Sequence, residues 1–174
     1  MDFVIKATNR HELRLYSKLF RSICGFAEDE PIDPVELLDR LPDLEGFCDV
    51  RYEVVYNNVL PGNVPARCIP DDNGYLIQIK ESVYLGALEK KTGGYRMHIM
   101  HEIMHPFLDK LGYRPIYERQ LTKDTPVYCR LEWAVKAIAG EVMIPYNATR
   151  DMSEKEIVSF YGVSPAAAKK RKTY

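Results

Sequence analysis

Three of the four histidines in this chain of 174 residues lie within the run RMHIMHEIMH, residues 96–105. His101, Glu102 and His105 form the H-E-x-x-H pattern within that run. Residues four apart stack on one face of a helix, so both imidazoles are expected to reach a single metal ion. Imidazole is a ligand that zinc favours, and the pattern therefore predicts a Zn²⁺ site. Glu102 is predicted to be the general base, taking a proton from a water that the metal has acidified.

A catalytic zinc usually has three protein ligands and one open position, so the chain must supply a further ligand. The metzincin pattern is excluded, because leucine stands at both positions where that pattern requires Gly and His. The aspartate pattern G-T-x-D-x-x-Y-G is echoed only by L-T-K-D ending at Asp124, which leaves Asp124 and Glu118 as weak candidates. A strongly helical segment at residues 131–141 offers Glu132 and Glu141. The residues alone do not decide which of these carboxylates is the third ligand.

The metal-binding motif is expected on a helix from residue 95 to about 109. Two apolar rows run along this segment and are typical of a helix buried on most sides: Ile99, Ile103 and Phe107, and Met100, Met104 and Leu108. Pro106 removes a helix hydrogen bond directly after His105 and is expected to kink or end the helix there. His98 lies one turn before His101 on the same face, and we interpret it as a residue that either lines the cleft or supports a metal ligand.

The elements around this helix can be read from capping residues and from the period of the apolar pattern. Helices are predicted from the N-cap Asn9, from Asp33-Pro34, and at 82–90, 131–143 and 153–161, with strands at 50–56, 66–69 and 75–80. We expect the strands to form an antiparallel meander, with 75–80 as an edge that receives an extended peptide. Strands between blocks of helix indicate an α+β fold, with a small antiparallel three-stranded sheet beside the active-site helix.

Composition sets limits on the class of protein. Apolar residues make up 46% of the chain, which is enough to bury a core. The 24 basic and 25 acidic residues nearly cancel, which excludes a protein whose whole surface serves to bind polyanions. No apolar run is long enough for a transmembrane helix, and the first residues lack a secretory signal, so a cytoplasmic protein is expected. Residues 1–152 are expected to form a zinc peptidase-like domain, and 153–174 a helix-turn-helix-like tail packed on it, overall one single domain.

Two segments together resemble the ImmA/IrrE family of metallo-endopeptidases. The family pattern R-F-T-L-A-H-E-x-G-H is similar to residues 96–105, and E-W-x-A-N-x-F-A-x-x-L-L-M-P is similar to 132–145. The resemblance covers about residues 75–165 and implies Glu132, in preference to Glu141, as the third zinc ligand. It also implies site-specific cleavage of a helix-turn-helix transcriptional repressor, often encoded beside the protease on a mobile element or in a stress-response system.

The chain departs from the family pattern at positions near the site. Met104 stands where the pattern has Gly, and Lys136 stands where it has Asn, a residue whose small polar group could orient a zinc-bound histidine. These departures, with Pro106, put turnover in question more than metal binding. The leading hypothesis is therefore a zinc metallopeptidase. The alternative is a non-catalytic zinc-binding regulatory or toxin-antitoxin-like protein that acts by binding a partner, and direct binding of nucleic acid through the tail is the least favoured.

Overall fold

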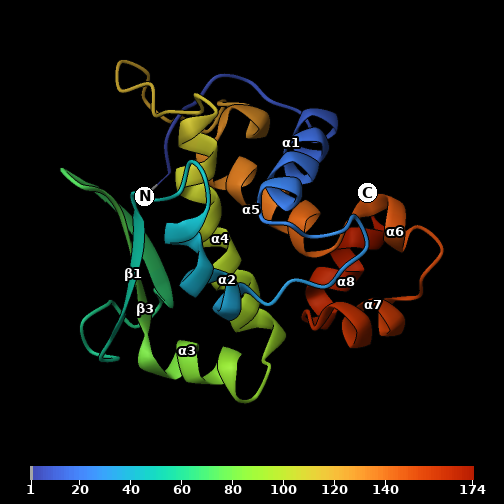
Figure 1. The fold of residues 1–174 in the computed structure, drawn as a ribbon. Coiled ribbons are helices and arrows are strands. Elements are labelled where there is room, and N and C mark those ends of the chain that lie inside the picture. Colours follow the sequence, from blue (N-terminus) through green and yellow to red (C-terminus); the bar gives the residue numbers. More distant parts are fainter. Residues whose placement is uncertain (1) are drawn as a thin grey trace.

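The computed structural model describes residues 2–174 and confirms an α+β fold arranged around one long helix. The helices are α1 (Arg10–Ile23), α2 (Pro34–Arg40), α3 (Glu81–Leu88), α4 (Gly93–Lys110), α5 (Leu131–Met143), α6 (Tyr146–Thr149), α7 (Glu154–Tyr161) and α8 (Pro165–Lys172), and the strands are β1 (Val50–Val55), β2 (Ala66–Asp71) and β3 (Gly74–Lys80). The sheet lies on one side of α4, and α1 and α5 lie on the other (Figure 1). Within the described residues, no helix is both long and apolar enough to cross a membrane.

Helix starts follow the capping residues that the sequence predicts. The Asn9 side chain accepts a hydrogen bond from the backbone N–H of Glu12 at 3.0 Å, and α1 begins at the next residue. The Asp33 side chain accepts from the N–H of Val35 at 3.0 Å, with Pro34 in the first position of α2. In both cases a short polar side chain satisfies a backbone donor that the helix itself leaves unpaired.

The sheet is mixed, so the predicted antiparallel meander is wrong. Its strand order is β1-β3-β2, in which β1 pairs with β3 in parallel and β2 pairs with β3 antiparallel. The ten-residue connection 56–65 lets the β2–β3 hairpin turn so that β3 docks beside β1. Two side chains of β3, Ile77 and Ile79, are fully buried, which favours the central position for this strand.

The edge strands also differ from the prediction. Because β3 (residues 74–80) is paired on both sides, it is not free to receive a peptide, and the expectation that residues 75–80 form an edge is wrong. The edges are β1 and β2, and β2 packs against α4. An edge strand therefore does lie beside α4, but it is β2, whereas the sequence indicated the segment that forms β3.

Helix α4 is buried on most sides, as its apolar rows predict. Five of the six side chains in those rows are fully buried and the sixth nearly so: Ile99, Met100, Ile103, Met104, Leu108 and Phe107. The helix continues through Pro106 to Lys110, close to the predicted extent of 95 to about 109, so of the two effects expected of Pro106 the end of the helix does not occur. A proline removes only one hydrogen bond, and burial of the following turn offsets that loss.

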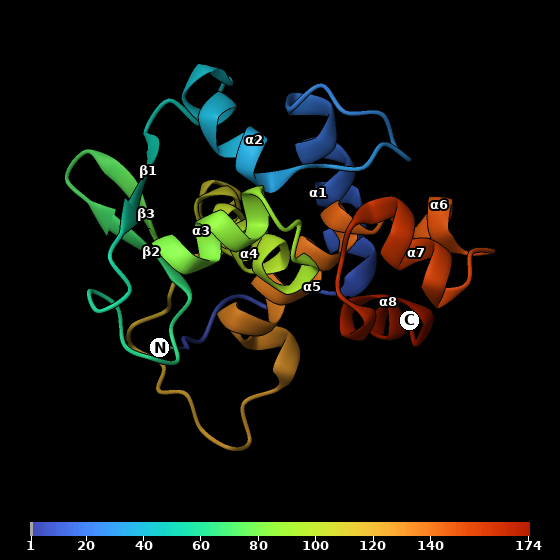
Figure 2. The same cartoon turned by 90° about the horizontal axis from the view of Figure 1, so that it is seen from below.

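The C-terminal helices pack onto the rest of the chain. Figure 2 shows α6, α7 and α8 at the end of the molecule opposite the sheet. Helix α7 starts with a capping box formed by Ser153 and Glu156 and ends at Gly162, whose φ is 61°. The guanidinium of Arg96, on α4, donates to the carbonyl of Gly162 at 3.3 Å and to that of Ile32 at 2.9 Å. The first turns of α4 are thus tied to the turn between α7 and α8.

Candidate metal centre

The histidines of the motif and one glutamate of the next long helix converge where α4 and α5 pack side by side. The Nε2 atom of His101 lies 3.2 Å from Oε2 of Glu132, and Nε2 of His105 lies 3.7 Å from Oε1 of the same carboxylate. The two imidazole rings have centroids 5.0 Å apart. The structure thus brings together the three side chains that the sequence and the family resemblance suggest as ligands.

These separations can be compared with those of a zinc site. With metal–ligand distances of about 2.0–2.1 Å and tetrahedral angles, two ligand atoms lie about 3.3 Å apart. The two distances from the histidines to Glu132 lie close to that value, whereas Glu102 is farther from both: its oxygens lie 4.0 Å from His101 and 3.9 Å from His105. The two histidines and either carboxylate therefore fit a zinc ion, and the shorter distances favour Glu132 as the ligand.

Burial sets the protonation states of the site. Glu102 is 8% exposed, and this burial raises the pKa of its carboxyl to about 7, against the opposing effect of His101. The backbone N–H of Cys68, in β2, also favours its ionised form. Burial lowers the pKa of His105, and a hydrogen bond with His101 lowers the pKa of Glu132. A neutral imidazole and an ionised carboxylate are the forms that bind a metal, and a carboxyl that titrates near neutrality suits proton transfer.

Asp2 supports the third candidate ligand and was not identified by the sequence analysis. The backbone N–H of Glu132 donates to Oδ1 of Asp2 at 2.9 Å, and no side chain of the residue preceding α5 provides a cap. The N–H of Leu131 also donates to the carbonyl of Phe3 at 3.0 Å, beside a bridge between Val4 and residue 130. The N-terminal segment therefore fixes the first turn of α5. No local sequence signal could have indicated this, because the partners are far apart in the chain.

The other candidate carboxylates are occupied elsewhere or lie away from the histidines. Glu141 is 1% exposed and pairs with Arg171 at 3.0 Å and with Arg14 at 3.3 Å. Glu118 and Asp124 are exposed in the segment between α4 and α5. Among the described residues, the group whose ligand atoms all lie within 4.8 Å of one another is His101, Glu102 and His105, so Glu102 is also placed to reach a metal ion. The arrangement in residues 2–174 thus leaves Glu132 as the carboxylate that meets both imidazoles, with Glu102 next.

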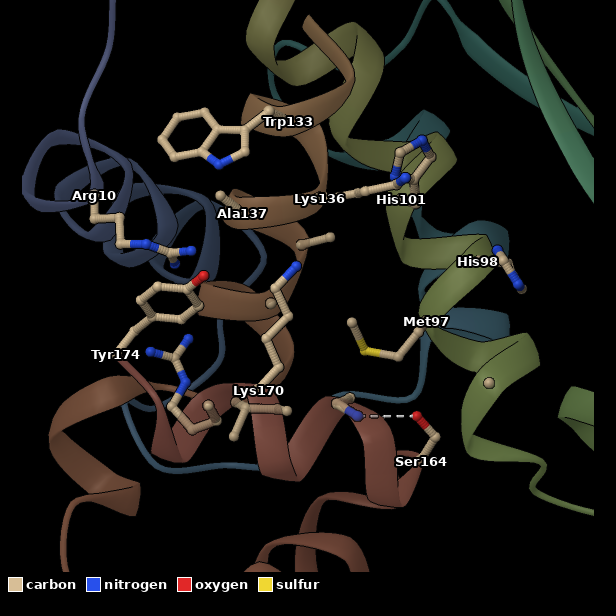
Figure 3. Close-up of a pocket in the computed structure, with 16 residues that line it drawn as sticks. Arg10, Met97, His98, His101, Trp133, Lys136, Ala137, Ser164, Lys170 and Tyr174 are labelled. Atoms are coloured by element: carbon tan, nitrogen blue, oxygen red, sulfur yellow. Dashed lines mark hydrogen bonds between the residues drawn. The ribbon is translucent and has the colours of Figure 1, made fainter. Parts of the chain in front are cut away.

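A cavity of about 320 Å³ lies beside His101, bordered by α1, α4, α5 and α8. His98 is one of its lining residues, in agreement with the first of the two roles expected for it. Lys136, the lysine that departs from the family pattern, extends from α5 toward α4 on the side where His101 lies (Figure 3). The site therefore combines a candidate metal centre with an adjoining space large enough for a small molecule or a side chain.

Comparisons with known proteins bear on the fold. No protein-family model matches the chain, and no curated protein matches its sequence. Among solved structures, a Mycobacterium tuberculosis transcriptional regulator is similar, with a TM-score of 0.60 and 15% sequence identity over 92% of this chain and 46% of that chain. The chain therefore spans about half the length of that regulator. At this identity the likeness shows the fold alone, and the resemblance to the ImmA/IrrE family stays a prediction.

Proposed function

We propose that the protein is a cytoplasmic zinc-dependent metallo-endopeptidase of the ImmA/IrrE type. In this proposal His101, His105 and Glu132 hold the zinc ion, and Glu102 is the general base. The observation that carries the proposal is the set of four distances between the two imidazoles and the two carboxylates. Glu132 lies 3.2 and 3.7 Å from the imidazoles and Glu102 lies 4.0 and 3.9 Å from them, which supports Glu132 as the ligand and Glu102 as the base beside it.

The chain's own residues account for the remaining steps. Zinc, when bound, supplies Lewis acidity that activates a water and polarises the peptide carbonyl. Glu102 accepts the proton of that water and then passes it to the leaving amine, which its pKa of about 7 allows in both directions. An extended substrate adds to the free edge of β2, because β2 packs against α4 and the backbone N–H of Cys68 faces Glu102.

The proposed substrate is a helix-turn-helix transcriptional repressor, as the family resemblance implies. A second candidate function is that of a zinc-holding regulatory protein that binds a partner without cleaving it. One observation favours this second candidate: Lys136, which stands where the family pattern has a small amide, contributes a cation to the cavity that His101 also lines (Figure 3). The solved structure with a similar fold is likewise described as a transcriptional regulator.

Metal content tests the centre itself. Elemental analysis of the purified protein should find about one zinc ion per chain. The His101→Ala and Glu132→Ala variants should each lose that zinc or hold it more weakly, whereas Asp124→Ala, which removes an exposed carboxylate of the neighbouring loop, should retain it. Absence of zinc even after its addition, or full occupancy in Glu132→Ala, would contradict the proposed ligand set.

Cleavage separates the two candidate functions. The protein and its Glu102→Gln variant would each be incubated with a helix-turn-helix repressor, and the products followed by mass spectrometry. The peptidase proposal expects cleavage by the wild type and a rate at least about 100-fold lower for the variant, with zinc content unchanged. A zinc-loaded wild type that binds the repressor and leaves it intact would favour the regulatory candidate.

A further inference from the structure

The cavity beside His101 has a basic border without acidic residues. Of the described residues that line it, none is an aspartate or glutamate, whereas Arg10, Lys136, Lys170 and Arg171 all contribute to its wall. These cations come from three helices that are far apart in the sequence, α1, α5 and α8. The fold thus gathers positive charge at one place on a chain whose formal net charge is -1.

Aspartate and glutamate side chains of the described chain leave most of this charge unpaired, and the terminal carboxyl group, on Tyr174, accepts from the Arg14 guanidinium at 3.1 Å. Arg171 is buried and is met by Glu141, which lies behind the wall at 3.0 Å. Within residues 2–174, Arg10, Lys136 and Lys170 form no ion pair with a carboxylate, and both lysines are exposed. Arg10 stacks on the ring of Tyr174, its guanidinium carbon 3.5 Å from the ring centroid, which holds that charge at the border of the cavity.

The interior of the cavity is apolar. Met97, Trp133 and Ile144 line it together with several alanines. Figure 3 shows Met97 pointing from α4 into the space, and the Lys170 side chain running from α8 toward α5 and ending between α5 and α4. The volume of about 320 Å³ lies at the lower end of the range for small-molecule sites. A cavity with an apolar interior and unpaired cations at its border fits a ligand with an apolar stem and an anionic end.

We propose that this cavity binds a small organic anion, a carboxylate or phosphate carried on an aromatic or aliphatic stem. Lys170 and Lys136 bind the anionic group, and Trp133 and Met97 pack against the stem. The same chemistry is available from a second source, the acidic side chain of a polypeptide that reaches the metal centre. That second source rests on the proposed function, whereas binding of a free anion does not.

The chain carries its own probe for this test, because Trp133 is its single tryptophan and lines the cavity. Phenylbutyrate would be titrated into the protein while tryptophan emission is recorded, with phenylbutanol as the uncharged ligand of the same shape. Zinc-loaded and metal-free protein would be compared, since a carboxylate also binds zinc directly. We expect saturable binding of phenylbutyrate to both forms, and binding of phenylbutanol weaker by about tenfold or more.

Two lysines of α8 provide a matched pair of variants. Lys170→Met should weaken phenylbutyrate binding about tenfold. Lys169→Met removes the same charge from the same helix at an exposed position outside the cavity, and should leave binding unchanged. Equal affinity for the acid and the alcohol, or equal weakening by both variants, would overturn the proposal, because either result would mean that no anion is bound at Lys170.

A competition experiment with a peptide identifies the source of the anion. A short peptide with one glutamate would compete with phenylbutyrate, next to the same peptide with glutamine in that place. Binding of phenylbutyrate without competition by the glutamate peptide supports a free small-molecule ligand. Binding of the glutamate peptide alone would overturn that assignment and give the cavity to a polypeptide side chain. If the protein does not bind zinc, the titration of phenylbutyrate into metal-free protein still tests the anion site. This proposal and the proposed function can therefore fail separately.

Discussion

Replacement of Asp2 by alanine should loosen the helical turn that carries Glu132 and weaken zinc binding without removing a ligand. Oδ1 of Asp2 accepts the backbone N–H of Glu132 at 2.9 Å, and no side chain of the residue before α5 caps that helix. Loss of such a cap costs about 1 kcal/mol. The carboxylate also carries a negative charge at the positive end of the helix dipole, which adds to the loss.

The expected magnitudes follow from this figure. A loss of about 1 kcal/mol in the free energy of unfolding lowers the melting midpoint of a chain of this size by about 2–4 °C. If the same free energy must be supplied again to order the Glu132 turn when the metal binds, the dissociation constant for zinc rises about fivefold. A larger rise, of about 100-fold, would mean that Asp2 acts as a ligand and not as a cap.

The assay pairs thermal unfolding, recorded with a chelator present, with a zinc competition titration against a chromophoric chelator. Asp2→Asn retains an oxygen acceptor and should recover most of the stability and the affinity, and Asp124→Ala should match the wild type in both. A variant Asp2→Ala that melts at a lower temperature but binds zinc as tightly as the wild type would refute the link between this cap and the position of Glu132.

Three further predictions concern packing around the site and the metal itself. Glu141→Gln should lower the free energy of unfolding by about 3–5 kcal/mol, because it leaves the buried Arg171 without its anion. Arg171→Met should cost less, since Glu141 keeps Arg14 as a second cationic partner. Urea unfolding of both variants measures the two losses, and a larger loss for Arg171→Met would contradict this reasoning. Gly162→Ala should destabilise by about 1–3 kcal/mol, because Gly162 has a φ of 61° and a Cβ there would collide with the guanidinium of Arg96. Gly140→Ala, inside α5 with open space around the new methyl group, should instead stabilise by about 1 kcal/mol, and opposite signs in chemical denaturation are the outcome to look for. Zinc at about one hundred times its dissociation constant should stabilise the fold by about 2.7 kcal/mol, and an unchanged melting curve after chelation would argue against a bound ion.

What could be predicted from the sequence is mostly local. The N-caps Asn9 and Asp33 mark the starts of α1 and α2 because a cap involves a side chain and a backbone group two or three residues away. The relation between His101 and His105 follows in the same way from the helical repeat. The apolar rows of α4 predicted a buried helix for the same reason, and the structure confirms it.

What could not be predicted depends on contacts between distant segments. Strand order is decided by which strand buries most apolar surface after the hairpin docks, and Ile77 and Ile79 place β3 in the centre although the sequence pattern suits a meander equally well. The residues alone left the third ligand open, because the choice depends on how α5 packs on α4. Pro106 shows the limit of a local rule, since the helix passes through it when the next turn is buried.

The contact between Asp2 and Glu132 has a consequence for the order of folding. It joins residues that are 130 apart in the sequence, whereas the two histidines share one helix. Closing a longer chain segment costs more entropy, and contacts between distant residues form late. The two-histidine half of the centre is therefore expected to form first, and the third ligand to be fixed only when the N-terminal segment docks. Refolding in the presence of zinc should then show weak early capture of the ion followed by a slower tightening, and a single fast phase would count against this order.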